Sequence, residues 1–99
     1  RTDASTLRRW FNEMQLWEKA RRGELQLRVV DDIVPVYASR DEPPGTRSQA
    51  VEYWDGDTRV AVVFQYLRPD GSIGGSGRPD PKFLLRDGVQ YVVAPPGST

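Results

Sequence analysis

Three Asp-Gly dipeptides constrain the fold of this 99-residue sequence more than any other feature. They are Asp55-Gly56, Asp70-Gly71 and Asp87-Gly88, and apolar and polar residues alternate in the segments that flank the first and the last of them. Asp-Gly accepts the positive φ angles of a tight turn, so it commonly joins two neighbouring antiparallel strands. The second half of the chain is therefore predicted to be a meander of short antiparallel strands.

The first quarter of the chain predicts a helix with one apolar face. Large apolar side chains recur there at spacings of three and four residues, namely Leu7, Trp10, Phe11, Met14 and Trp17. Asp3 or Ser5 can accept hydrogen bonds from the free amides of the first turn, and Gly23 provides a left-handed stop. We expect this helix over about residues 5–22, with its apolar face buried against the sheet.

Together these patterns predict a single α+β domain over residues 1–99, an N-terminal amphipathic helix packed on an antiparallel meander sheet of about five or six strands. A strongly bent sheet or a small open barrel is the alternative, because glycines gather between residues 71 and 77. Strands are expected at about 25–30, 33–38, 49–54, 57–67, 72–76, 83–86 and 89–93. We expect the helix to cover the sheet face that bears Val60, Val62 and Phe64.

The turn at Asp55-Gly56 also predicts how the first hairpin is paired. A two-residue loop at these positions places Glu52 opposite Arg59 and Val51 opposite Val60. Opposite charges and apolar side chains then face each other across the two strands, which stabilises the pairing.

The composition narrows the range of functions. Fourteen basic residues balance fourteen acidic ones, so no overall field attracts the chain to nucleic acid or to an anionic membrane. Cys and His are both absent, which excludes thiol catalysis and removes the commonest general base and metal ligand. We therefore expect no cofactor, no metal site and no catalytic residue. The lack of disulfides and of a long apolar run favours a cytoplasmic protein without membrane contact.

The most distinctive segment runs from Gly71 to Lys82 and is rich in glycine. Its backbone amides, together with Arg78 and Lys82, could cradle a phosphate or a carboxylate. It lacks the Gly-Lys-Ser/Thr of a P-loop, and Asp80 and Pro81 stand where a dinucleotide fingerprint needs glycine and a helix. The simpler interpretation is a pliable connector. We expect it to be exposed, more mobile than its flanking strands, and the place of any anion site.

Five residues are the candidate binding residues: Tyr53, Trp54, Arg68, Arg78 and Lys82. The two aromatic residues are adjacent on a predicted strand, so alternation turns one ring inward and the other outward, where it could anchor a partner. The three cations lie close together in the sequence, although interleaved aspartates largely cancel their charge.

The leading prediction is a non-catalytic binding or interaction module that is part of a larger protein or assembly. Its partner is expected to be another protein or domain, with nucleic acid less favoured. The alternative is a small, toxin-like, metal-independent ribonuclease, in which Arg or Lys stabilises the phosphorane and a Tyr or carboxylate moves the proton. A concave cluster of the candidate cations with a Tyr would favour the nuclease, and a flat apolar patch around Trp54 would favour the module.

Overall fold

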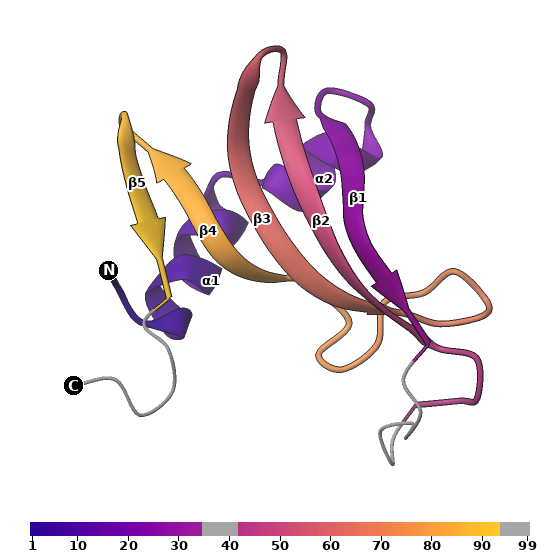
Figure 1. Cartoon of the computed structure of the whole chain (residues 1–99). Helices are drawn as coiled ribbons and strands as arrows, with labels where there is room; N and C mark the ends of the chain where they lie inside the picture. The colour runs from indigo at the N-terminus through magenta and orange to yellow at the C-terminus, as the bar shows by residue number, and fades with distance from the viewer. Residues whose placement is uncertain (35–41, 94–99) are drawn as a thin grey trace.

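The chain forms two short helices and one five-stranded antiparallel sheet in this computed structural model, which describes residues 1–34 and 42–93. The elements are α1 (Ala4–Glu13), α2 (Leu16–Arg21), β1 (Gln26–Ile33), β2 (Arg47–Asp55), β3 (Thr58–Leu67), β4 (Asp80–Arg86) and β5 (Val89–Val92). Sequential strands are neighbours in the sheet, whose order is β1-β2-β3-β4-β5 (Figure 1). The predicted α+β architecture, with the helical segment packed on an antiparallel meander, is confirmed.

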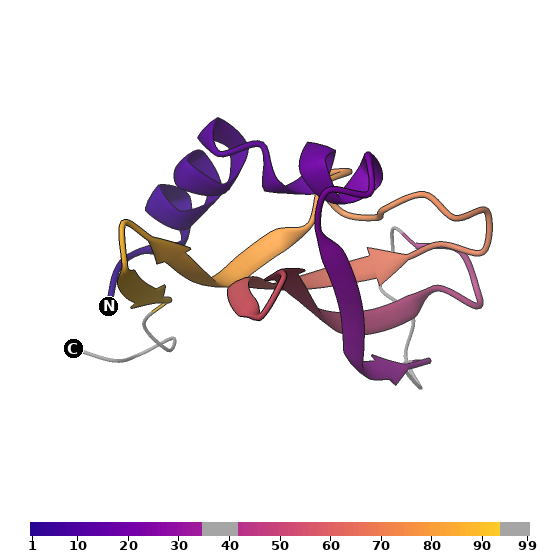
Figure 2. The ribbon, with the colours of Figure 1, turned by 90° about the horizontal axis from the view of Figure 1, so that it is seen from above.

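Both helices lie on the same face of the sheet, as the view from above shows (Figure 2). The sheet is open and curved, and β1 and β5 are its two edges. Thr2 lies beside the end of β5. Its amide donates to the carbonyl oxygen of Val92 at 2.9 Å, and Thr2 forms a parallel bridge with Val93. The N-terminus is thereby attached to the β5 edge.

The helical segment is broken at Gln15, so the prediction of one continuous helix over residues 5–22 is wrong at this point. Gln15 has a φ of 55°, in the left-handed region that interrupts an α-helix. In a continuous helix Leu16 would point about 140° away from Phe11, because successive residues turn by about 100°. The break brings both of these side chains into the core, where each is at least 96% buried. Of the two caps that we predicted, Asp3 is the one observed, since its carboxylate accepts from the Thr6 amide at 2.7 Å.

The helices cover the face of β3 opposite to Phe64, and of the three residues that we predicted beneath them only Val60 packs against the core. Beneath them lie Ala61 and Val63, whereas Phe64 is 51% exposed on the open face. Both faces of β3 are apolar, so alternation along this strand could not distinguish them. The neighbouring strand β2 determines which face the helices cover. Its Tyr53 and Val51 pair with Ala61 and Val63 and extend the apolar surface under the helices.

The helix residues that we expected to be buried do pack against this core. Phe11 is fully enclosed, while Trp10, Met14 and Trp17 are partly buried at its border. The core residues are Leu7, Phe11, Leu16, Leu25, Val51, Tyr53, Ala61, Val63 and Leu84. Leu16, which follows the break at Gln15, is thus a helix residue of the core that we did not predict.

The two hairpins differ in how well the sequence predicted them. Asp87 and Gly88 form the β4–β5 turn with φ angles of 52° and 76°, as expected. In the β2–β3 hairpin Asp55 instead pairs with Thr58, so Gly56 and Asp57 make the turn.

The predicted register of the β2–β3 hairpin is also wrong, because the turn is displaced and a bulge follows it. A bulge at Val60 shifts the pairing, and Glu52 stands opposite Val62 rather than Arg59. Val51 likewise stands opposite Val63. The long Arg59 side chain still reaches Glu52 across the shift, with an Nη1–Oε2 distance of 3.1 Å.

Two other predicted strands also differ. The ranges 25–30 and 33–38 were expected to be separate strands, but β1 runs continuously through a bulge at Val30 as far as Ile33. The rest of the second range, from residue 35, lies outside the described residues. Residues 72–76 form a loop in which Ile73 makes a single bridge with Leu67. The sheet therefore has five strands.

Candidate functional site

A concavity lies between α1, the glycine-rich loop (residues 71–79, between β3 and β4) and the end of β3. We call it the α1–loop cavity and define it by six of its lining residues: Arg8, Phe64, Tyr66, Arg78, Asp80 and Lys82. Its volume is about 620 Å³. It forms because β4 begins at Asp80, opposite Phe64, so the last residues of β3 have no β4 partner and the chain between them is free to loop outward.

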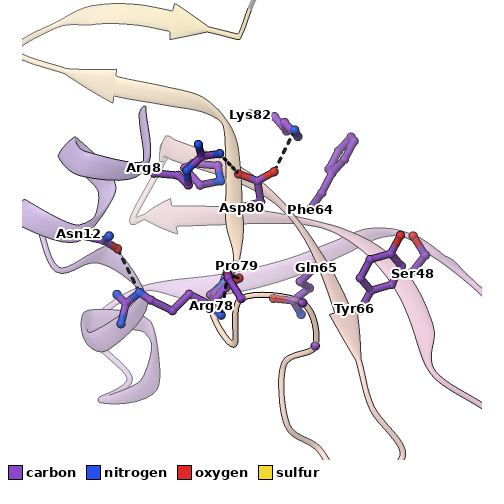
Figure 3. A pocket seen from close by; sticks show the side chains of 14 residues that line it. Arg8, Asn12, Ser48, Phe64, Gln65, Tyr66, Arg78, Pro79, Asp80 and Lys82 are labelled. Carbon is purple, nitrogen blue, oxygen red and sulfur yellow. Dashed lines mark hydrogen bonds and ion pairs between the residues drawn. The ribbon is translucent and has the colours of Figure 1, made fainter. Parts of the chain in front are cut away.

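Asp80 is the centre of the charged side of this cavity (Figure 3). Its Oδ1 lies 3.5 Å from Nη1 of Arg8 on α1, and its Oδ2 lies 3.0 Å from Nζ of Lys82 on β4. One carboxylate therefore holds two cations at the cavity wall. All three side chains are more than one-third exposed, so solvent weakens both pairs.

Arg78 joins the glycine-rich loop to both helices. Its Nε donates to Oδ1 of Asn12 at 3.1 Å, and its Nη2 donates to Oε2 of Glu18 at 2.9 Å. Its guanidinium also lies over the Trp17 ring, 4.7 Å from the centroid. The hydrogen bond from Arg78 is the main cause of the lowered pKa of Glu18. Arg78 is thus a structural link as well as a cavity residue.

The apolar side of the cavity is formed by two rings from β3. Phe64 and Tyr66 are 51% and 41% exposed, and alternation places both on the open face of the sheet. Lys82 Nζ lies 5.7 Å from the centroid of the Phe64 ring. A ligand in the cavity could therefore contact an aromatic ring and a cation at the same time.

A buried carboxylate, that of Glu42, accepts a hydrogen bond from the backbone of the glycine-rich loop. The Glu42 side chain is only 3% exposed, and its Oε1 accepts from the Gly75 amide at 2.8 Å. Its Oε2 accepts from Nε of Arg68 at 2.7 Å. The sequence predicted that this loop could cradle a carboxylate, and Glu42 of the same chain occupies that role. The Arg68 hydrogen bond, followed by that of Gly75, lowers the pKa of Glu42.

Between Gly71 and Lys82, residues 71, 72 and 75–77 are exposed, whereas Gly74, Pro79 and Pro81 are buried. The expected exposure therefore holds for the glycine-rich tip of this segment and not for all of it. Its greater mobility stays a prediction. The anion site that we expected at this loop with Arg78 and Lys82 stays a prediction, and of the loop amides Glu42 accepts from that of Gly75.

The structure brings together two of the five predicted binding residues. Arg78 and Lys82 line the cavity, but Arg68 is bound to Glu42 instead. Tyr53 is the ring that alternation turned inward: it is 1% exposed, packs 5.7 Å from Phe11 between ring centroids, and its burial raises its pKa to about 12.

Trp54 is the outward ring of the pair and is half-buried. Its Nε1 donates to Oε1 of Glu52 at 3.2 Å. It lies six residues along β2 from Ser48, which lines the cavity, and this spacing corresponds to about 20 Å in a strand. Trp54 and the cavity are therefore separate surfaces.

Sequence reasoning missed Arg8 and placed Phe64 in the core. The sequence signal for Arg8 is its position four residues before Asn12, which puts both side chains on one polar side of α1. The structure shows that both line the cavity. Its partner Asp80 is 72 residues away in the chain, so no local pattern connects them.

Comparisons with known proteins add no identification. The chain matches no protein-family model, no curated protein and no solved structure. Across residues 1–34 and 42–93, no group of three or more acidic, His or Cys side chains is arranged to hold a metal ion. Nor does the described part of the chain contain a helix long and apolar enough to cross a membrane.

Proposed function

We propose that this domain is a non-catalytic binding module and that the α1–loop cavity receives its ligand. One observation carries the proposal: a single concavity combines two half-exposed aromatic rings with three cations. Rings and guanidinium groups that converge on a concave surface are typical of the energetically dominant part of an interface.

A segment of a partner protein is the ligand that fits this cavity best. Arg8 and Lys82 share Asp80, and Arg78 is bound to Glu18, so each cation already faces a carboxylate. This balance leaves only a weak field for a polyanion such as RNA. A peptide that carries one carboxylate beside an apolar side chain would match the cations and the rings together.

Two of the predicted contact residues do not belong to this surface. Tyr53 is enclosed in the core. Trp54 is hydrogen-bonded to Glu52 at the end of β2 that is far from the cavity. Arg68 contributes indirectly, because its ion pair with Glu42 supports the loop that forms one wall of the cavity.

The proposal is tested with a random peptide library displayed on phage and selected against the purified domain. We expect enriched peptides to place Asp or Glu within a few residues of an aliphatic or aromatic side chain. Isothermal titration of a synthetic copy should show at least tenfold weaker binding for Phe64→Ala and for Lys82→Ala. Lys19→Ala is the matched control, because Lys19 is the only other lysine and does not line the cavity. Equal affinity in all these variants would refute the proposal.

The ribonuclease stays a second candidate because Tyr66 shares the cavity with Arg8, Arg78 and Lys82, the concave arrangement that we expected to favour it. These are the residue types that such chemistry needs without histidine. We rank it below the binding module because each of these cations already faces a carboxylate. A fluorogenic single-stranded RNA provides the test. For a binding module we expect no cleavage beyond that of a preparation carrying Lys82→Ala. Cleavage by the wild type that is lost in Lys82→Ala but kept in Lys19→Ala would establish the nuclease instead.

A further inference from the structure

Strand β1 is an exposed sheet edge with unusually apolar side chains. All eight of its residues, Gln26–Ile33, are exposed, and β2 is its one neighbour in the sheet. About half of the surface of each of five aliphatic residues on and next to this strand is exposed: Leu27, Val29, Val30, Ile33 and Val34. An edge of this length and composition is a template for pairing with a further strand, unless charges or a covering segment protect it.

The other edge of the sheet is less open. Strand β5 has only four residues, and the N-terminal Thr2 pairs beside its end. Strand β1 has twice that length, and no strand of the described residues covers it. If the sheet is extended by another chain, β1 is the edge that can accept it.

The bulge at Val30 gives β1 a symmetrical pattern of faces. Before the bulge, Arg28 and Val29 pair with Glu52 and Val51, on opposite faces of the sheet. After it, Asp31 pairs with Ala50 and therefore lies on the same face as Arg28. Three pairs of residues at equal distances from the bond between Val29 and Val30 therefore share a face, namely Arg28 with Asp31, Leu27 with Asp32, and Gln26 with Ile33.

This symmetry suits a second copy of the same strand. When two copies of β1 run antiparallel about a twofold axis between Val29 and Val30, the two members of each of these pairs stand opposite each other on the same face of the joined sheet. Arg28 of each copy then stands opposite Asp31 of the other, and Val29 stands opposite Val30. The interface would contain two identical pairs of opposite charges around an aliphatic centre.

The charges needed for this pairing are available. Among the described residues, neither the Arg28 nor the Asp31 side chain has a hydrogen-bond or ion-pair partner, although the pKa of Glu52, which is lowered mainly by the Arg59 hydrogen bond, is lowered slightly further by the charge of Arg28. Glu52, the cross-strand neighbour of Arg28, is already bonded to Arg59 at 3.1 Å and to Trp54 at 3.2 Å. Asp32, the third charged residue of β1, is held by Arg47 at 2.6 Å. Of the three charged side chains of β1, Arg28 and Asp31 are thus the two that make no ion pair with a described residue, and they have opposite signs.

We propose that the domain forms a twofold-symmetric dimer through β1, which joins two five-stranded sheets into one continuous antiparallel sheet. A second copy is favoured over a different protein because the strand complements itself both in the faces of its side chains and in its charges. The inference is independent of the ligand proposed for the α1–loop cavity.

Sedimentation velocity over a wide concentration range tests the dimer with charge variants. We expect the wild type to show a reversible, concentration-dependent dimer. Arg28→Asp alone puts acidic residues opposite each other at both pairs, and Asp31→Arg alone does the same with basic residues, so each variant should be monomeric. An equimolar mixture of the two variants should dimerise, because opposite charges then meet again at both positions. The double variant R28D/D31R should also dimerise by itself.

Circular dichroism confirms that each variant is folded, which is expected because both positions are exposed. A wild type that stays monomeric at the highest concentration would overturn the proposal. So would single variants that associate as the wild type does, which would place the interface elsewhere. Monomeric single variants that fail to recover association on mixing would refute the Arg28–Asp31 register and therefore the proposed dimer.

Discussion

At the scale of single residues, Glu42 and Gly74 show how one buried carboxylate organises the glycine-rich loop. Glu42 binds Arg68 and the Gly75 amide, and Gly74 packs directly against its carboxylate. A Cβ atom on Gly74 would lie 2.6 Å from Oε2 of Glu42, too close for two nonbonded atoms. The φ angle of Gly74 is not in the positive region where glycine is favoured. Glycine is therefore needed here for space.

The first prediction follows from this close approach. Gly74→Ala should destabilise the domain by about 1–3 kcal/mol, because the added methyl group overpacks a closed site. In an ordinary backbone conformation with room for the side chain, the same change would instead stabilise by about 0.4–1 kcal/mol. Urea denaturation of a double-mutant cycle with Glu42→Ala measures the coupling. The cost of Gly74→Ala should largely disappear in the Glu42→Ala background, and additive effects would contradict this account.

The second prediction concerns the acid stability that Glu42 provides. Its pKa in the folded protein is below the ordinary value of 4.5, mainly because of the Arg68 hydrogen bond. The ionised group therefore contributes stability that is fully present above pH 4.5 and is lost as the pH falls through the folded pKa.

Thermal melts of the wild type and Glu42→Gln at several pH values test this contribution. The wild type should have the higher Tm at neutral pH, and the difference should shrink as the pH falls below about 4.5. The pKa values of Glu18, Glu52 and Asp32 are also lowered by Arg partners, so both proteins should lose stability in acid. A Tm difference that is independent of pH would contradict a role for the ionised Glu42.

At the scale of elements, the helical segment shows a local preference overruled by packing. The apolar spacing from Leu7 to Trp17 is helical throughout, but Gln15 adopts a left-handed conformation that ends one helix and starts the next. A residue with a Cβ atom costs about 1–2 kcal/mol in this region, and glycine avoids that cost. Burial of Leu16 offsets it.

The third prediction uses the sign of a glycine substitution. Gln15→Gly should stabilise the domain by about 1 kcal/mol, because glycine adopts the left-handed conformation without strain. In a continuous helix the same substitution would cost about 1 kcal/mol. Arg9→Gly, in the middle of α1, is the matched control and should cost that amount. Chemical denaturation of both variants measures the two signs, and a loss of stability in Gln15→Gly would argue for an unbroken helix.

At the scale of the whole molecule, the sheet has a face covered by the helices and an open face, and the two differ in their apolar side chains. The covered face holds the core, including Leu84, which is fully buried. The open face carries Phe64 and Tyr66 at the rim of the α1–loop cavity. The core residues of β3 and the two rings of the proposed ligand site therefore lie on opposite faces of this strand.

The fourth prediction separates these faces. Leu84→Ala should destabilise the domain by about 2–5 kcal/mol, because it leaves a cavity in the core. Phe64→Ala should cost no more than about 1 kcal/mol although it removes a larger side chain, because half of the ring is already in solvent. Urea denaturation of the two variants gives the comparison. A larger cost for Phe64→Ala would mean that the helices cover the Phe64 face, as the sequence alone had suggested.

The sequence by itself determined those features that depend on neighbouring residues. The Asp3 cap, the meander order of the strands and the Asp87-Gly88 turn were all predicted, because capping and turn formation are set by backbone stereochemistry over a few residues. Tertiary structure alone decided which face of β3 meets the helices, since both faces are apolar and the choice depends on how neighbouring strands pair.

The candidate site depends even more on tertiary structure. The sequence singled out Arg78 and Lys82, but only folding brings Arg8 to Asp80, 72 residues away, and Glu42 to Gly75, 33 residues away. Charged side chains this far apart leave no periodic signal, and their pairing follows from where the sheet places β4 and its preceding loop. Local hydrogen bonding therefore fixed the elements, whereas burial and long-range pairing of side chains fixed the site.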